Sequence, residues 1–478
     1  MLALTKDDIA HRCDFDAKWA KRDFVYEASN YVRSSLLKAL IVSGLRGTGK
    51  TTGMYQLAMD FDALYLCAEK GEQASAEDYA RLLQEADKKL VILDEYTWIQ
   101  NRKDAFLDNI VNNCVQHGKK VILTGTESAN LESLRHKELI HRAECLHVTR
   151  FSFEEFQRIH QGHLPSQPKQ LYDSFLKEGG IFYGYVNKTA KGMDDYIQNS
   201  IIDNLYSYIG NASTLPREEI ATAVYTVLYD AVRDVMSEKV PGEEFTFQAR
   251  EKLSRLGVQD VDSPVSSDTI KSVGEILESI GVLVKVPNIV ERKARRPEDD
   301  YRLYIVNPAI TWNLAKIIYD PIKSEKRILA KLMEAAVLVD LASHKLQDDD
   351  LFFFENEHGE VDAVIAPNSG ESDISLFEVK HRSRITSHDL KTKKWTILTG
   401  KAEEAISKRF PNNDVANRYF VYTGSPSCFC LKGKNGTPDK TFLLVGMDDW
   451  LHRYWDFQKN TKEILHQYGK LGDTPMVP

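Results

Sequence analysis

The sequence predicts a multidomain α/β protein, and three observations support this prediction. At 478 residues the chain is too long for a single hydrophobic core. Continuous apolar runs at 39–42, 63–66, 90–93 and 121–123 alternate with helix-length segments, which is typical of a buried parallel sheet with helices on both faces. Nearer the C-terminus, a long helical segment precedes three β-rich runs, so we expect a second, mixed α/β unit there.

We expect four regions along the chain. Residues 1–150 contain the strands and helices of the parallel sheet, and residues 151–240 are mainly helical. Residues 241–324 follow the element order of a winged helix, and residues 325–478 form the mixed α/β unit. No internal repeat or low-complexity segment interrupts this organisation.

The winged helix is predicted from the order helix, strand, basic loop, strand. Ser267 can cap a helix that Gly281 ends, and β-rich runs follow at 282–286 and 301–306. The loop between these runs carries four basic residues that could contact DNA phosphates, Arg292, Lys293, Arg295 and Arg296. Three acids at 298–300 leave open the alternative of a solvated loop whose charge is neutralised internally.

Composition and charge restrict the class of protein. With 42% hydrophobic and 28% charged residues, the chain has the composition of a soluble globular protein, and no apolar run reaches the ~18 residues of a membrane span. Six scattered cysteines without a Cys-x-x-Cys pair argue against a zinc ribbon or a disulfide scaffold, so we expect a cytoplasmic protein. Because the net charge is −8, any surface that binds nucleic acid must be local.

A glycine-rich segment after the first predicted parallel strand fits the phosphate-loop pattern G-x-x-x-x-G-K-[ST]. Its backbone N–H groups can bind phosphate oxygens at a helix N-terminus, Lys50 can reach the β- and γ-phosphates, and the Thr51 hydroxyl can bind Mg²⁺. A chance glycine-rich turn is the alternative, which the strand ahead of the motif disfavours. The predicted nucleotide-binding residues are Gly44, Leu45, Arg46, Gly47, Thr48, Gly49, Lys50, Thr51 and Thr52.

Two later strands end in polar residues that suit nucleotide hydrolysis. The run at 90–93 leads directly into Asp94 and Glu95, and paired carboxylates at the end of a buried strand are costly unless they have a role. Asp94 is suited to Mg²⁺ and Glu95 to polarising an attacking water. Thr124 ends the run at 121–123, where its hydroxyl could sense the γ-phosphate or orient that water.

The C-terminal unit carries a second set of candidate catalytic residues. Asp362 and Glu378 are separated by a hairpin's length, so they can meet across paired strands, and Lys380 shares a strand face with Glu378. Carboxylates can bind Mg²⁺ or Mn²⁺, and a lysine can stabilise a phosphate; Glu334, in the preceding helix, could add another acid. A solvent-facing ion pair is the alternative, but the basic segment 380–394 favours a nucleic-acid site.

These residues together resemble a prokaryotic family of AAA-plus-like, STAND-related P-loop ATPases. Its members join a P-loop NTPase domain to a winged helix and a C-terminal domain similar to PD-(D/E)XK nucleases. The resemblance spans about residues 30–425. Its marks are the phosphate loop, Leu93-Asp94-Glu95, the sensor-like strand 123–126, Arg142 preceded by His141 in place of the family's Gly, the SFEEF-like segment 151–156, and segments 178–182 and 304–308.

The resemblance implies a P-loop NTPase parallel sheet, a helical and winged-helix middle, and a C-terminal nuclease-like domain. It implies binding and hydrolysis of ATP with Mg²⁺, with Arg142 as a γ-phosphate contact. It also implies a DNA-directed role for the C-terminal half, where a second Mg²⁺ or Mn²⁺ could bind. The nuclease-like signature maps onto Glu334, Asp362, Glu378 and Lys380.

Three functions stay open at this point. The first is an ATP-dependent enzyme that gates a DNA-binding or DNA-cleaving domain. The second is a nucleotide-regulated switch whose C-terminal domain binds without cutting. The third is a signalling or defence scaffold that forms a homo-oligomer when ATP is bound.

Overall fold

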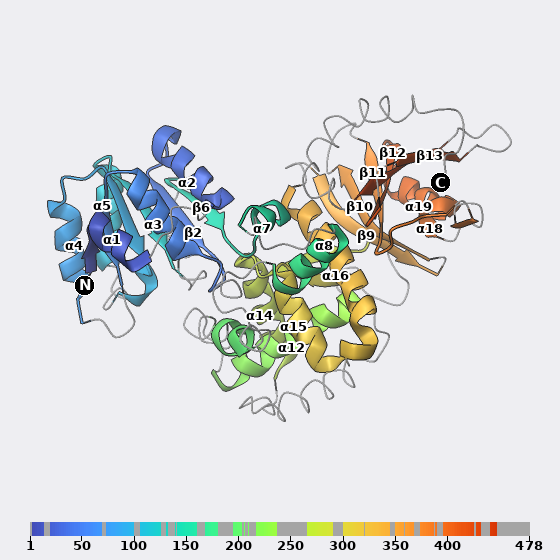
Figure 1. Cartoon of the computed structure of the whole chain (residues 1–478), viewed down its shortest axis with the longest axis horizontal. Helices are drawn as coiled ribbons and strands as arrows, with labels where there is room; N and C mark the ends of the chain where they lie inside the picture. The colour runs from blue at the N-terminus through green and yellow to red at the C-terminus, as the bar shows by residue number, and fades with distance from the viewer. Residues whose placement is uncertain are drawn as a thin grey trace. The chain divides into compact units, whose positions relative to one another are not determined.

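The computed structural model divides into two compact units (Figure 1). Unit 1 comprises residues 1–164, 178–227 and 253–283, and unit 2 comprises residues 165–177, 228–252 and 284–478. The structure describes residues 2–13, 20–68, 73–99, 106–125, 131, 139, 141–159, 168–179, 195–202, 205, 209, 217–236, 265–289, 300–319, 321–344, 349–357, 359–367, 373–386, 388–389, 395–424, 427–431 and 440–446.

Unit 1 contains a six-stranded sheet in the order β1-β3-β4-β5-β2-β6. Only β1 runs antiparallel to its neighbour, and the other pairs are parallel. The four predicted apolar runs form β2 to β5, which confirms the parallel sheet. The strands are β1 (Leu2–Leu4), β2 (Ala39–Ser43), β3 (Ala63–Cys67), β4 (Leu90–Asp94), β5 (Lys120–Thr124) and β6 (Ala143–His147).

Helices cover both faces of this sheet because its strands are apolar on both faces. Leu40 and Val42 face a core shared with α1 (Lys6–Cys13), α2 (Asp23–Ser34) and α3 (Lys50–Asp60). Ile41, between them in sequence, faces the opposite core, which is shared with α4 (Ala76–Glu85) and α5 (Phe106–Gln116). The alternation follows from the period-two geometry of a strand.

The middle of the chain is helical where the structure describes it, as predicted. Between 151 and 240 the described elements are α7 (Phe153–Ile159), α8 (Pro168–Glu178), the π-helix η3 (Ile197–Ile202) and α12 (Arg217–Met236).

The helix and the two strands predicted between 267 and 306 are present as α14 (Ser267–Ser279), β7 (Leu283–Pro287) and β8 (Tyr301–Ile305). Ser266, not the predicted Ser267, caps α14, because its side chain accepts a hydrogen bond from the N–H of Thr269. The division into units falls between Leu283 and Val284. The basic loop with Arg292, Lys293, Arg295 and Arg296 lies outside the described residues.

The hairpin of β7 and β8 is hydrogen-bonded to the C-terminal sheet within unit 2. Asn288 donates to the backbone oxygen of Glu355 at 3.0 Å and accepts from its N–H at 3.2 Å. Arg302 of β8 donates to the carboxylates of Glu355 at 2.8 Å and Glu360 at 2.6 Å. A basic residue of this hairpin therefore reaches the acids of the sheet. The helix α15 (Pro308–Ile318) follows the hairpin.

Unit 2 contains a mixed sheet in the order β13-β14-β12-β11-β10-β9. Its antiparallel part is β9 to β11, whereas β12 pairs in parallel with β11 and with β14. The three predicted β-rich runs form β9 to β11, which confirms the predicted mixed α/β unit. Its elements are α16 (Pro321–His344), β9 (Asp349–Asn356), β10 (Gly359–Pro367), β11 (Ile374–Lys380), α18 (Thr396–Thr399), α19 (Lys401–Arg409), β12 (Val415–Tyr422), β13 (Ser427–Leu431) and β14 (Lys440–Gly446).

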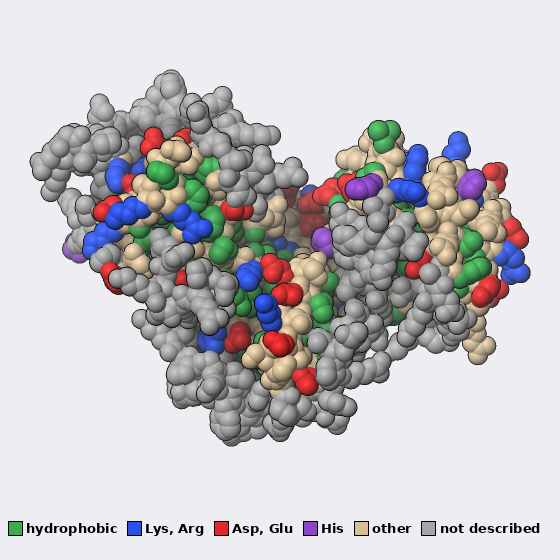
Figure 2. All heavy atoms as spheres, turned by 180° about the vertical axis from the view of Figure 1, so that it is seen from behind, with side chains coloured by type: hydrophobic (Ala, Val, Ile, Leu, Met, Phe, Trp, Pro, Cys, Tyr) green, Lys and Arg blue, Asp and Glu red, His purple; other side chains and the backbone are tan. Residues whose placement is uncertain are grey.

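None of the helices described has both the length and the apolar character to span a membrane. On the face of the molecule shown in Figure 2, the basic and acidic side chains of the described residues lie interspersed.

Candidate functional site

The phosphate loop connects the end of β2 to the start of α3. Gly44, Gly47 and Gly49 have φ values of 136°, 78° and 81°, a region that strongly favours glycine. A Cβ on Gly44 would lie 2.1 Å from the carbonyl oxygen of Val148, so no side chain fits there. A Cβ on Gly47 would lie 2.6 Å from the hydroxyl of Tyr196. Position 44 therefore requires glycine both for backbone shape and for space, whereas Gly47 and Gly49 favour it through their φ values.

Lys50 is buried at the first position of α3. Its Nζ donates hydrogen bonds to the carbonyl oxygens of Gly44 and Leu45, both at 2.8 Å. Burial lowers the pKa of Lys50 to about 8, although the carboxylates of Glu95 and Asp94 oppose this shift. The lysine thus binds the first two residues of the loop, and the two acids lie close enough to act on its charge.

Asp94 ends β4 and is almost fully buried. Its carboxylate accepts hydrogen bonds from the Tyr65 hydroxyl at 2.7 Å and the Glu95 N–H at 3.0 Å, and Thr51 also hydrogen-bonds to it. Burial raises the pKa of Asp94, and these hydrogen bonds and Lys50 limit the rise. The structure therefore brings Asp94 and Thr51 together, as a shared Mg²⁺ would require.

Glu95 follows Asp94 with a φ of 49°, a left-handed conformation that non-glycine residues rarely adopt. Such backbone strain is concentrated at functional sites. It precedes the short 3₁₀-helix η1 (Tyr96–Trp98). A Cβ on Gly125 would lie 3.7 Å from Oε2 of Glu95, so the carboxylate extends toward the residue after β5.

Two threonines with buried hydroxyls lie close to Gly125, the residue after β5. Thr124, predicted from the end of β5, is fully buried, and its hydroxyl has no hydrogen-bond partner among the described residues. The same holds for Thr97, which sequence reasoning missed. Thr97 Oγ1 is 3.3 Å from the Cβ position of Gly125. The only sequence signal for Thr97 is its place two residues after Glu95.

Arg142 lies far from the phosphate loop within one chain. It precedes Ala143, which pairs with Ala39 at the start of β2, whereas the loop follows Ser43 at the end of β2. Five strand residues separate these edges by about 16 Å. The guanidinium of Arg142 donates instead to Asn112 at 2.5 Å. The structure therefore places Arg142 at the end of β2 opposite the phosphate loop.

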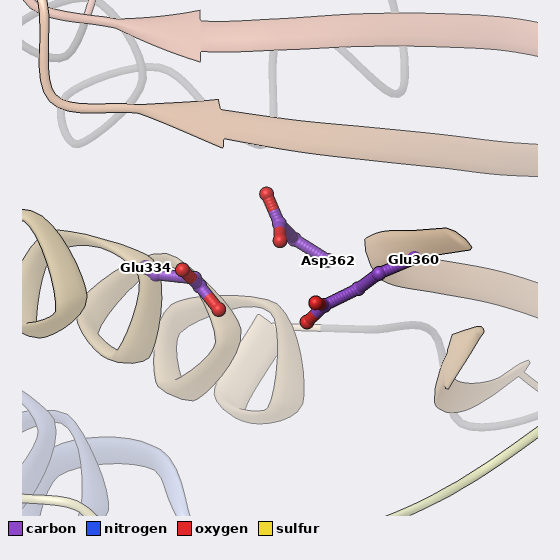
Figure 3. Close-up of side chains that lie close together, drawn as sticks. All are labelled: Glu334, Glu360 and Asp362. Carbon is purple, nitrogen blue, oxygen red and sulfur yellow. The ribbon is translucent and has the colours of Figure 1, made fainter. Parts of the chain in front are cut away.

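Three carboxylates meet in unit 2. Glu334 of α16 and Glu360 and Asp362 of β10 each present one oxygen within 4.8 Å of the other two (Figure 3). Such an all-oxygen donor set suits Mg²⁺ or Mn²⁺. The structure thus brings together the predicted Glu334 and Asp362 and adds Glu360. The sequence signal for Glu360 was its place two residues before Asp362, on the same strand face.

Glu378 belongs to the same neighbourhood without being one of this trio. Lys380 Nζ lies 2.6 Å from Oε1 of Glu378 and 3.4 Å from Oδ2 of Asp362. Asp362 also accepts a hydrogen bond from the N–H of Val379 at 2.6 Å. The other oxygen of Glu378 is buried and has no hydrogen-bond partner in the part of the chain that the structure describes. The predicted meeting of Asp362 and Glu378 therefore occurs through Lys380.

Cations balance these acids. Lys331 donates to Glu334 at 2.8 Å, and Arg302 donates to Glu360 at 2.6 Å. Even so, burial raises the pKa of Glu334 to about 7 and that of Glu378 to about 8, and the charge of Asp362 adds to both shifts. The centre thus holds more carboxylates than cations, and a divalent ion would relieve the excess.

Comparison with known proteins bears on unit 1. Residues 37–157, about a quarter of the chain, match the family model described as an AAA domain. This segment, called the AAA region below, is thus similar to AAA domains. Because it contains the phosphate loop, Asp94, Glu95 and Thr124, the candidate nucleotide site lies entirely within this AAA region.

No curated protein matches the chain. Among solved structures, it is similar to a Walker-type ATPase of Pyrococcus abyssi (14% identity, 62% of this chain, 95% of that chain, TM-score 0.37). It is also similar to AMPPCP-bound DnaA from Aquifex aeolicus (15% identity, 54% of this chain, 86% of that chain, TM-score 0.29). A third similar structure is the Thermotoga maritima RuvB Holliday junction branch migration motor (12% identity, 57% of this chain, 70% of that chain, TM-score 0.21). At such low identities and TM-scores, these similarities add nothing on function.

Stability should depend on pH through the two buried glutamates. The pKa values of both glutamates in the folded protein lie above the ordinary value of 4.5. Their contribution to the free energy of unfolding is therefore fully present below pH 4.5, and it is lost as pH rises through about 7 for Glu334 and about 8 for Glu378. We expect the melting temperature to fall between about pH 5 and about pH 9. The double variant Glu334→Gln, Glu378→Gln should show a flatter profile by calorimetry. Parallel profiles for the two proteins would contradict this assignment.

Proposed function

We propose that the chain is a Mg²⁺-dependent ATPase whose nucleotide state regulates a C-terminal unit that binds or cleaves DNA. The observation that carries this proposal is the meeting of Lys50, Thr51, Asp94 and Glu95 at the carboxyl edge of one parallel sheet, beside a loop in which Gly44 has no space for a side chain. Ligands bind at this edge in α/β sheets.

Each residue of the AAA region then has a role that its position supports. The amides of the loop and the N-terminus of α3 would bind the phosphates, with Lys50 at the β- and γ-phosphates and Thr52 in the first turn of the helix. Thr51 and Asp94 would hold Mg²⁺, which neutralises phosphate charge when bound.

Glu95 would accept a proton from the attacking water. The water oxygen bonds to the γ-phosphorus, the bond to the β–γ bridging oxygen breaks, and ADP leaves with that electron pair. Thr124 would orient the water or the γ-phosphate. Because Arg142 is remote within one chain, a γ-phosphate contact from it would require a second copy, as in the predicted homo-oligomer.

For unit 2, the centre of Glu334, Asp362, Glu378 and Lys380 supports metal-dependent hydrolysis of phosphodiesters. The acids would hold Mg²⁺ or Mn²⁺, and Lys380 would stabilise the anionic phosphate. DNA would bind near the C-terminal unit and the predicted winged helix, where the basic segment 380–394 would neutralise phosphates.

One observation favours a second candidate, a nucleotide-regulated switch that binds DNA without cutting it. Lys331, Arg302 and Lys380 already pair with Glu334, Glu360 and Glu378. Acids neutralised in this way can persist without a metal ion.

The ATPase proposal predicts different effects for two substitutions. Lys50→Ala should abolish ATP binding, whereas Glu95→Gln should retain binding and lower hydrolysis by about 100-fold or more, because it spares the phosphate-binding loop. A fluorescent ATP analogue measures binding, and phosphate release measures hydrolysis. Glu85→Gln, an exposed change on α4, is the matched control. Wild-type rates in Glu95→Gln would remove this residue from the mechanism.

The metal centre predicts stabilisation by a divalent ion in the absence of ATP. Mn²⁺ at about 100 times its Kd should stabilise the protein by about 2.7 kcal/mol, measured as a rise in melting temperature. Asp362→Ala should remove that rise. Lys380→Ala should keep the rise and reduce plasmid nicking, because the lysine acts on phosphate.

DNA binding without nicking by the wild-type protein would favour the switch. If Mn²⁺ does not change the melting temperature of the wild-type protein, the proposed metal centre is refuted. Glu404→Ala, in an exposed ion pair on α19, provides the control.

A further inference from the structure

A buried ion pair joins the start of unit 1 to the segment after β6. Arg22, just before α2, and Glu155, in α7, are 7% and 3% exposed. They form a two-pronged contact, with Nε to Oε1 at 3.0 Å and Nη2 to Oε2 at 2.9 Å. Two parallel hydrogen bonds of this kind fix the orientation of the guanidinium and neutralise its charge, whereas a lysine would act only as a point charge.

Further hydrogen bonds complete both ends of this pair. Glu155 accepts from the N–H of Asp23 at 2.7 Å and of Ser152 at 2.8 Å. Arg22 also donates to the carbonyl of Arg150 at 2.6 Å, and its guanidinium carbon lies 4.0 Å from the centre of the Phe151 ring. A buried pair persists when its remaining hydrogen-bonding groups are satisfied, as they are here.

The remaining nitrogen of Arg22 contacts the phosphate loop itself. Nη1 donates a hydrogen bond to the backbone carbonyl of Thr48, between Gly47 and Gly49. In a trans peptide the C=O and the next N–H point in opposite directions, and the described chain has no cis peptide. Drawing the Thr48 carbonyl toward Arg22 therefore turns the N–H of Gly49 away from Arg22. This N–H belongs to the loop whose amides receive phosphate.

We propose that Arg22 and Glu155 are positioning residues for the nucleotide site. Glu155 fixes the guanidinium of Arg22, and Arg22 fixes the peptide between Thr48 and Gly49 so that its N–H is directed for phosphate. The same contact ties the loop to α7. The proposal rests on the proposed ATP binding and adds to it two residues outside the phosphate-loop motif.

The test compares Arg22→Lys and Glu155→Gln with wild type in binding of fluorescent ADP with Mg²⁺. Losing one charge-assisted hydrogen bond should raise Kd by about tenfold or more. Arg158→Ala should leave Kd unchanged, because its 2.5 Å ion pair with Asp23 joins the same two segments but does not touch the loop.

A second readout separates positioning from general stability. Adding ADP should increase hydrogen-exchange protection of α7 in the wild-type protein and not in Glu155→Gln. Unchanged Kd in both variants, with the wild type binding ADP, would overturn the positioning role alone. No binding by the wild type would instead overturn the proposed function.

An independent observation concerns Thr97. Its hydroxyl is buried and lacks a hydrogen-bond partner among the described residues, although such groups are normally paired. One point, the Cβ position of Gly125, lies 3.3 Å from this hydroxyl and 3.7 Å from the Glu95 carboxylate. The Thr97 hydroxyl and the Glu95 carboxylate therefore both lie close to Gly125, the residue after β5. The fully buried hydroxyl of Thr124, the preceding residue, also lacks a partner in the described chain.

We infer that Thr97 is a catalytic residue of the ATPase, whose hydroxyl binds the attacking water beside Glu95. This inference also rests on the proposed hydrolysis. The proton of that water passes to Glu95 as described above, and Thr97 only fixes the position of the oxygen. Positioning a reactant in this way acts on the rate and not on nucleotide affinity.

Thr97→Val keeps the shape of the side chain and removes the hydroxyl, whereas Thr97→Ser keeps the hydroxyl. We expect kcat to fall about tenfold or more in the valine variant, with ATP affinity unchanged and with most activity kept in the serine variant. Wild-type kcat in Thr97→Val would overturn the inference. Absence of hydrolysis by the wild-type protein would overturn the proposed function instead.

Discussion

The cost of burying charge governs both candidate sites of this protein. An isolated ion transferred into a protein interior loses several kcal/mol of solvation, so it persists only with partners. In the AAA region, Lys50 is buried against the loop carbonyls and near Asp94, which is itself held by Tyr65 and Thr51. The arrangement keeps a cation and an anion beside the phosphate loop, where phosphates and Mg²⁺ would add charges of both signs.

The same constraint shapes the carboxylate centre of unit 2. Here the acids outnumber the cations, and burial raises the pKa of Glu334 and Glu378. An excess of carboxylates is unfavourable in an apolar core unless protons or a divalent ion bind to it. Arg302 brings one of the balancing charges from the β7–β8 hairpin, so the hairpin forms part of the electrostatics of the centre.

The AAA region depends on contacts far apart in the chain. The phosphate loop is a local motif, yet Arg22, which donates to the carbonyl of Thr48 in this loop, is itself paired with Glu155, more than 100 residues away in the chain. The SFEEF-like segment contains Glu155 and therefore binds the arginine that contacts the phosphate loop. Its glutamate accepts four hydrogen bonds, three of them from Arg22 and Ser152 and one from Asp23.

The sequence by itself determined the parallel sheet, the mixed α/β character of the C-terminal unit, the phosphate loop and the acids Asp94 and Glu95. These features depend on local periodicity and on short motifs, which are visible along the chain. Tertiary structure alone decided which distant side chains meet. It placed Arg142 at the edge of the sheet opposite the phosphate loop, brought Glu360 close to Glu334 and Asp362, and placed the Thr97 hydroxyl and the Glu95 carboxylate close to Gly125. Such meetings depend on strand order and register, which residue type and spacing do not specify.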